Sequence, residues 1–244
     1  MKENKYDDSG FFEKYSQMAR SIGGLDAAGE WPALRALLPE LAGKNVLDLG
    51  CGYGWHCRYA RERGAHSVVG LDLSEKMLQR AREMTNDSAI TYRKLAIEDI
   101  DYEAGQFDVV ISSLAIHYVR DFELLSRRIH YCLAQGGSFV LSVEHPVFTS
   151  RAEQDWHYDE HGEKMHWPID HYQDEGERAA RFLDHDVVKY HRTVASYMNT
   201  LLDAGFAIDR VSEPGPTKEA LMKDPEMRHE ARRPIFLLIA AVKK

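Results

Sequence analysis

The sequence has 244 residues, 44% of them hydrophobic, which is enough for one substantial core, so we expect a single α/β domain with an insertion. Its formal net charge of −8 argues against a general attraction to nucleic acid or to an anionic membrane, so neither is an expected partner. Three scattered cysteines without a C-x-x-C pair, a polar N-terminus and the absence of 18 consecutive apolar residues predict a cytoplasmic protein with no disulfide, zinc site or membrane span.

A helical cap is expected over residues 1–45. Four leucines between residues 34 and 41 recur at positions i, i+3, i+4 and i+7, the spacing of one face of an α-helix, and Gly43 is placed to end it. This spacing predicts an amphipathic helix ahead of the first strand.

Between residues 46 and 143 the sequence alternates short β-rich runs with helical periods. A helix with Ser74 as its N-cap and a second helix between Phe122 and Leu133 follow the helical period. Strands are expected near residues 46–49, 68–71, 90–93, 107–112 and 138–143. Because this is the rhythm of βαβ units, a parallel sheet with helices on both faces is predicted.

The rhythm stops after Pro146. Residues 147–190 are rich in histidine, aromatic and acidic residues with little periodicity, and we interpret them as an insertion. Their histidines raise the question of a metal site, but no cysteine or H-E-x-x-H pattern accompanies them, so no metal is expected. Regular structure returns near residue 194 with a helix that Gly205 ends, followed by strands at 206–211 and 235–242.

The run from Val46 to Gly54, V-L-D-L-G-C-G-Y-G, leads an apolar strand into a loop with glycine at three alternate positions. Such a loop lets the backbone approach a ligand, and the following helix offers free N–H groups to an anion. Trp55 takes the third-glycine position of the G-x-G-x-x-G dinucleotide pattern, so NAD fits poorly. Asp72 ends the next strand, 20 residues after Gly52, where a carboxylate either accepts hydrogen bonds from a ribose diol or only starts the next helix.

This D-x-G-x-G-x-G pattern, followed by the strand-terminal Asp72, resembles the class I S-adenosylmethionine (SAM) dependent methyltransferases. Further segments that begin at Leu73, Phe107 and Leu133 resemble the family in the same order, and the resemblance covers roughly residues 44–146. It implies a Rossmann-like, doubly wound α/β sheet of seven mostly parallel strands, the last one antiparallel. It also implies an enzyme that takes its methyl group from SAM and leaves S-adenosylhomocysteine (SAH).

The resemblance further implies a set of cofactor contacts. The glycine loop would wrap the methionine end of SAM, and apolar side chains would flank the adenine. The family commonly has an acid for the adenine amino group where this sequence has Ala96, so Glu98 or the backbone of Ile97 would have to serve. The candidate cofactor-binding residues are Arg20, Asp48, Gly50, Cys51, Gly52, Asp72, Leu73, Ile97, Glu98, Ser113 and Leu114.

Some of these candidates have an alternative role in the scaffold. Asp48 would help to hold the cofactor ammonium group through the loop or a water, or would only fix the loop. Arg20 would bind the cofactor carboxylate or lie on a solvated helix face, and a purely structural role is open for Glu98. Ser113 and Leu114 follow the fourth strand, where the family places backbone carbonyls against the ammonium group.

Methyl transfer needs little covalent help because the sulfonium donor is already activated, so the main task is to hold the nucleophile about 3 to 3.5 Å from the methyl carbon. A base is needed only for an acceptor that does not give its proton to water. Three histidines are candidate catalytic residues: His145 beyond the fifth strand and His117 beyond the fourth as bases, and His191 before the last helix, where it would face an anionic or hydroxylated substrate. Each also has a structural alternative. His145 would shape the turn at Pro146, His117 would pack against the next helix, and His191 would belong to the scaffold.

We therefore predict SAM-dependent methylation of a small molecule by a monomer or homodimer, with oxygen slightly favoured as the acceptor atom by the histidines. Residues 46–146 would form the SAM-binding core, 147–190 an aromatic lid over the substrate, and 191–244 the helix and strands that complete the sheet. The alternatives are a SAM-binding regulatory module without turnover, an NAD-dependent oxidoreductase, and a methyltransferase that acts on RNA or protein.

Overall fold

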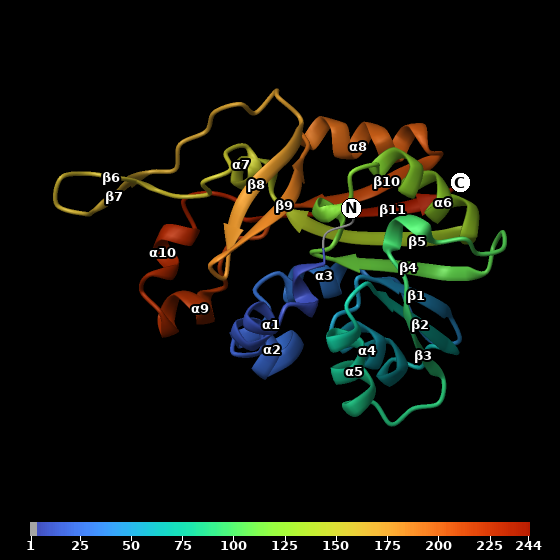
Figure 1. Ribbon diagram of the computed structural model, residues 1–244. Helices are drawn as coiled ribbons and strands as arrows, with labels where there is room; N and C mark the ends of the chain where they lie inside the picture. Colours follow the sequence, from blue (N-terminus) through green and yellow to red (C-terminus); the bar gives the residue numbers. More distant parts are fainter. Residues whose placement is uncertain (1–3) are drawn as a thin grey trace.

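The computed structural model describes residues 4–244, and its centre is a seven-stranded sheet (Figure 1). The strands are β1 (Asn45–Leu49), β2 (Ser67–Asp72), β3 (Ile90–Lys94), β4 (Phe107–Ser113), β5 (Leu133–Glu144), β10 (Phe206–Ser212) and β11 (Phe236–Lys243). Their order across the sheet is β10-β11-β5-β4-β1-β2-β3. The neighbours from β5 to β3 are parallel, whereas β11 is antiparallel to both β5 and β10. The predicted sheet with an antiparallel last strand is confirmed.

Helices cover both faces of this sheet, because successive side chains of each strand point to opposite sides. Leu47 of β1 packs in one cluster with α6 (Phe122–Cys132) and α8 (Val194–Asp203). Val46, its neighbour in the chain, packs on the other face with α4 (Trp55–Glu62) and α5 (Glu75–Glu83). The predicted N-cap of α5 is confirmed, since the hydroxyl of Ser74 accepts a hydrogen bond from the backbone N–H of Met77.

The helix that precedes the sheet is shorter than the leucine spacing predicts. This helix, α3 (Trp31–Leu37), packs on β5 and β11. Leu38 is extended, with φ −68° and ψ 138°, because the ring of Pro39 disfavours the helical conformation in the residue before it. The prediction that the helix continues to Gly43 is therefore wrong, although Leu41 is still buried in the core.

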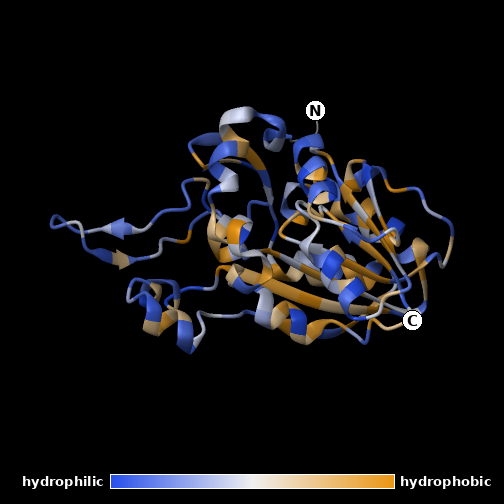
Figure 2. Ribbon diagram, turned by 90° about the horizontal axis from the view of Figure 1, so that it is seen from below, coloured by the Kyte–Doolittle hydropathy of each residue, from blue (hydrophilic) through white to orange (hydrophobic). Residues whose placement is uncertain are grey.

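Residues 147–190 contain two hairpins that the sequence did not reveal. β6 (His157–Tyr158) and β7 (Lys164–His166) form an arm that projects away from the sheet, and β8 (Gly176–Phe182) pairs with β9 (His185–His191) closer to it (Figure 1). Figure 2 shows that the arm is mostly hydrophilic, whereas the central strands are hydrophobic.

The β9 strand explains why these hairpins were missed. Its residues are buried at alternate positions, at Val187, Lys189 and His191. Two of these three inward side chains are polar, so the hydropathy of the sequence does not show the two-residue period of a strand.

The remaining elements are short. The N-terminal part consists of η1 (Lys5–Asp7), α1 (Ser9–Ser16), α2 (Ala19–Gly23) and η2 (Gly24–Ala27), and the others are η3 (Ile97–Asp99), η4 (Ile116–Tyr118), α7 (Pro146–Thr149), α9 (Lys218–Lys223) and α10 (Met227–Glu230). Within the described part of the chain, none of the helices combines the length and the apolar character that crossing a bilayer requires.

Candidate active site

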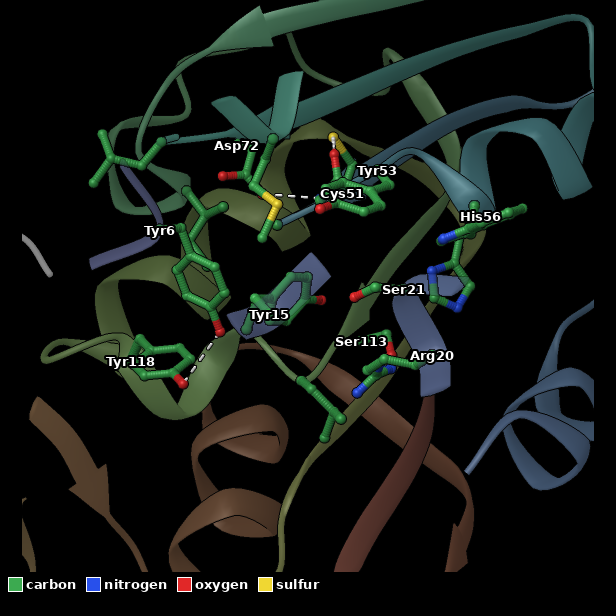
Figure 3. A pocket seen from close by; sticks show the side chains of 18 of the residues that line it. Tyr6, Tyr15, Arg20, Ser21, Cys51, Tyr53, His56, Asp72, Ser113 and Tyr118 are labelled. Atoms are coloured by element: carbon green, nitrogen blue, oxygen red, sulfur yellow. Dashed lines mark hydrogen bonds between the residues drawn. The ribbon is translucent and has the colours of Figure 1, made fainter. Parts of the chain in front are cut away.

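A cavity of about 210 Å³ lies at the carboxyl ends of β1, β2 and β4 (Figure 3). Open α/β sheets bind their ligands at this edge. The loops after these strands supply one part of its wall. Tyr6 and Tyr15 from the N-terminal elements and Phe182 from β8 supply another. The cavity is therefore lined by segments that are far apart in the sequence.

The glycine loop after β1 forms part of this wall. Gly50, Gly52 and Gly54 have φ values of 75°, 51° and 71°, a region that side chains disfavour. A Cβ atom on Gly50 would lie 2.4 Å from the Cβ of Ala115, so the packing there requires glycine. A Cβ on Gly52 would meet no atom of the described chain within 4 Å, so the absent side chain leaves room beside the cavity.

Asp72 lies at the end of β2 in the same wall. Its Oδ2 accepts a hydrogen bond from the backbone N–H of Gly52, and its Oδ1 accepts one from the backbone N–H of Ser74, both at 2.9 Å. Burial raises the pKa of Asp72 to about 6. The side chain is therefore mostly ionised at neutral pH, and both oxygens keep a lone pair for a ligand.

Arg20 also lines the cavity, where it is held by an acid that the sequence did not single out. Its Nη2 lies 2.5 Å from Oε1 of the buried Glu30. The hydroxyl of Ser113 is 3.3 Å from the same oxygen. The structure thus joins two predicted cofactor-binding residues through Glu30, which precedes α3.

Nine of the other ten predicted cofactor-binding residues line the cavity together with Arg20. They are Gly50, Cys51, Gly52, Asp72, Leu73, Ile97, Glu98, Ser113 and Leu114.

Asp48 is the tenth, and the structure does not bring it to the cavity wall. Its side chain is 1% exposed, and its Oδ2 accepts a hydrogen bond from the thiol of Cys57 at 3.2 Å. Its Oδ1 has no partner among residues 4–244, and burial raises the pKa of Asp48 to about 7. This geometry supports the alternative in which the acid acts on the scaffold beneath the loop.

The three candidate catalytic histidines are not brought together. His117 lines the cavity, whereas His145 and His191 do not. The Nδ1 of His145 accepts a hydrogen bond from the backbone N–H of Val147, and its Nε2 lies 2.7 Å from Glu213. This geometry supports the structural alternative for His145, which caps α7 at the turn before Pro146.

His191 is also engaged at both ring nitrogens. Its Nδ1 lies 2.8 Å from the hydroxyl of Thr149, and its Nε2 lies 3.0 Å from the backbone oxygen of Tyr172. The ring is fully buried and joins β9 to α7, so the geometry supports its place in the scaffold. Among residues 4–244, no cluster of three or more His, Cys, Asp or Glu side chains is arranged to hold a metal ion.

Comparisons with known proteins agree with this geometry. Residues 47–141 match the family model of a methyltransferase domain. A solved structure from Listeria monocytogenes, assigned to the SAM-dependent methyltransferases, is 50% identical, with a TM-score of 0.84 over 89% of this chain and 99% of the other. The chain belongs to the SAM-dependent methyltransferases.

Two further relatives are similar to this methyltransferase over nearly its whole length. A SAM-dependent methyltransferase from Mesorhizobium loti is 48% identical, with a TM-score of 0.85 over 90% of this chain and all of that structure (100%). An uncharacterized protein of Haemophilus influenzae is 35% identical over 98% of this chain and 96% of its own length. The similarity therefore includes the N-terminal and C-terminal parts as well as the strands around the glycine loop.

The cavity of the methyltransferase has the features that SAM requires. The missing side chain of Gly52 leaves room beside the loop, and the ionised Asp72 offers acceptors for the hydroxyls of a ribose. Arg20 supplies a cation for a carboxylate, and Leu73 and Ile97 supply apolar surface. The residues present therefore fit the cofactor of the family.

Four tyrosines in the same wall, Tyr6, Tyr15, Tyr53 and Tyr118, were not predicted as site residues. The hydroxyls of Tyr6 and Tyr118 are 3.4 Å apart, and the rings of Tyr6 and Tyr15 meet edge to face with centroids 5.3 Å apart (Figure 3). Burial raises the pKa of Tyr6 well above its usual range and raises that of Tyr15, so both side chains are uncharged. The methyltransferase thus presents aromatic faces and neutral hydroxyls here.

Glu144, at the end of β5, is a further wall residue that was not among the predicted site residues. The Nζ of the buried Lys189 lies 2.7 and 2.9 Å from its two carboxylate oxygens. Burial raises the pKa of Glu144, but the charge of Lys189 and the hydrogen bonds from Lys189 and Gln154 are among the causes that bring it below its usual value. The methyltransferase therefore holds a buried ion pair at the edge of its cavity.

Proposed function

We propose that this methyltransferase transfers the methyl group of SAM to a small molecule bound beside Tyr6, Tyr15 and His117. The observation that carries the proposal is that separate segments line the cavity on several sides. Its wall combines the strand ends with the N-terminal elements and with Phe182 of β8. An acceptor must fit inside this wall, which favours a small molecule over a folded RNA or a protein surface.

In the proposed arrangement the cofactor contacts follow the cavity wall. Asp72 binds the ribose, and the backbone of Gly50, Cys51 and Gly52 surrounds the methionine part. Arg20 binds the carboxylate. The other candidates continue along the same wall, with Leu73, Ile97 and Glu98 at the adenine and Ser113 and Leu114 at the ammonium group.

SAM supplies a methyl group on a positively charged sulfur. When bound, it would give this methyl group to a lone pair of the acceptor, and the electron pair of the broken carbon–sulfur bond would stay on sulfur. The protein holds the acceptor in line and excludes water, and such positioning is worth about 7 to 11 kcal/mol in favourable systems. Tyr6, Tyr15 and Tyr118 are placed to do so.

Oxygen is the first acceptor atom to test, because the wall beside His117 carries the neutral hydroxyls of Tyr6 and Tyr15. The part of residues 147–190 proposed as the lid is the β8–β9 hairpin, since Phe182 is the residue of this segment that lines the cavity. The projecting β6–β7 arm contributes no residue to it. The lid proposal therefore concerns one hairpin and not the whole segment.

The test uses SAM with a labelled methyl group and a cell extract separated into small molecules, RNA and protein. We expect the label in the small-molecule fraction with the unmodified chain and none with Asp72→Ala. Asp203→Ala, at an exposed position at the end of α8, is the matched control and retains the activity. Label in RNA or protein would contradict the proposal, and SAM binding without any labelled product would favour a regulatory module.

A further inference from the structure

His117 differs from the other two candidate catalytic histidines in keeping one ring nitrogen available. It belongs to η4, directly after β4, and its side chain is 2% exposed and lines the cavity. The backbone N–H of Glu144 donates to its Nδ1 at 3.4 Å. No group of residues 4–244 bonds its Nε2. The second nitrogen is therefore the one that can serve a ligand.

The partner of Nδ1 determines which nitrogen carries the proton. A backbone N–H is only a donor, so the Nδ1 that faces it must accept and can carry no proton itself. A neutral imidazole has one N–H, which is then on Nε2. The opposite tautomer would place two N–H groups against each other. His117 thus presents a hydrogen-bond donor, and not a basic lone pair, to the cavity.

The surroundings keep this ring neutral. Burial lowers the pKa of His117 to about 4. The charged groups that act on it come from several elements: Glu144 of β5, Lys189 of β9, Arg192 just after β9, and Arg20 of α2. Glu144 raises the pKa and the three cations lower it, and the ring of Tyr118 lies beside the imidazole with 4.5 Å between centroids.

Lys189 holds the group that orients His117. It is 1% exposed, and its Nζ donates to both oxygens of Glu144 and to Oε1 of Gln154 at 3.1 Å. An ammonium group has three donors, so all of them are used. Lys189 therefore offers nothing to a ligand, and its effect is to fix Glu144, whose backbone N–H bonds the histidine.

We infer that His117 donates its Nε2 proton to the methyl acceptor and takes no proton from it, with Glu144 and Lys189 as positioning residues. This inference rests on the proposed function. It defines the class of acceptor, because no base is then supplied by the histidine at this end of the cavity. The methylated atom must already have a free lone pair at neutral pH, as in a carboxylate, an acidic hydroxyl that has ionised, or a weakly basic amine that is not protonated. Any proton that the methylated product still carries is lost to bulk water after the product is released.

The tautomer can be measured without knowing the acceptor. The full chain, labelled with 15N in its histidines and saturated with SAH, is studied by two-bond 15N–1H correlation spectra between pH 5 and 8, with His117→Gln to assign the signal. We expect a proton on Nε2 and no titration over this range. A proton on Nδ1, or protonation of the ring near pH 6.5, would overturn the inference. The tautomer is read from the unmodified protein, and the variant serves only to assign the signal.

A charge variant tests the positioning pair. In Lys189→Met the uncompensated Glu144 remains beside the ring, so the protonation midpoint of His117 is expected to rise. Lys223→Met, which removes an exposed lysine on α9, is the matched control and leaves the midpoint unchanged. An unchanged midpoint in a folded Lys189→Met protein would contradict the role of the pair.

Activity separates a donor from a base once labelled product is found. His117→Gln keeps an N–H near the position of Nε2, whereas His117→Asn keeps an acceptor for the backbone of Glu144 and loses that donor. A donor role predicts that kcat/KM falls less than about 5-fold for Gln and about 10- to 100-fold for Asn. A general base predicts losses of about 10²- to 10⁴-fold for both. Absence of any product from the unmodified enzyme would count against the proposed function, while the tautomer measurement stands by itself.

Discussion

The carboxylate of Asp72 accepts a hydrogen bond from the backbone N–H of Gly52, with 2.9 Å between Oδ2 and the nitrogen. The contact joins the ends of β1 and β2, two adjacent parallel strands. It places a carboxylate and a loop without side chains side by side at the cavity. The two sequence features that indicated a nucleotide site are thus parts of one hydrogen-bonded structure.

Asp72→Asn tests this acid as the ribose anchor. The amide keeps only one oxygen, so it cannot accept from Gly52, Ser74 and a diol as the carboxylate does. Hydrogen bonds to charged groups are worth about 1.5 to 3 kcal/mol, so the Kd for SAH is expected to rise about 10- to 100-fold. Titration calorimetry measures it, with the exposed Asp203→Asn as control. An unchanged Kd would remove Asp72 from the site.

Gly52→Ala and Gly43→Ala form a matched pair. Both glycines have positive φ, 51° and 73°, and a Cβ on either would meet no described atom within 4 Å. Each alanine is therefore expected to cost about 1 to 2 kcal/mol of unfolding free energy, from backbone strain alone. Only Gly52 lines the cavity, so only Gly52→Ala should weaken SAH binding. Equal affinities in the two variants would show that the loop is not in contact with the cofactor.

The parts of this structure that the sequence predicts are those that local patterns determine. Strand and helix periods lie within short windows, so the sheet, the N-cap at Ser74 and the glycine loop follow from them. Asp72 could be found because its distance from Gly52 along the chain is fixed by one βαβ unit. Where a proline interrupted a period, at Pro39, the predicted helix end was wrong.

The remaining site residues meet through contacts between distant segments. Tyr6 and Tyr118 are 112 residues apart in the chain, and Lys189 and Glu144 are 45 apart. From the sequence alone, a lysine is expected at the surface. Its burial here depends on the ion pair with Glu144, which the sequence does not show. His145 had the chemistry of a base, but its hydrogen bonds at α7 became visible only in the structure.

The buried Asp48 is expected to make the unfolding free energy depend on pH. Its pKa in the folded protein is about 7, above its usual value, because burial disfavours the charge. Between about pH 4 and 7 the folded state binds a proton that the unfolded state has lost, so the unfolding free energy falls as the pH rises through this range. In Asp48→Asn this contribution is absent, and the variant should gain stability relative to the unmodified protein between pH 4 and 8. Urea unfolding at several pH values measures the difference in unfolding free energy between the variant and the unmodified protein. A difference that does not change with pH would contradict the raised pKa of Asp48.

Lys189→Ala tests the buried ion pair with Glu144. Breaking a buried pair leaves one charge uncompensated, so a loss of about 3 to 5 kcal/mol of unfolding free energy is expected. The double variant Lys189→Ala with Glu144→Gln removes both charges and should recover a large part of it. Arg127→Ala is the control, because its pair with Glu123 is 64% exposed on both sides and is worth at most about 1 kcal/mol. Denaturant unfolding measures all three variants. If the double variant is as unstable as Lys189→Ala, the loss comes from packing of the long side chain and not from the unpaired carboxylate.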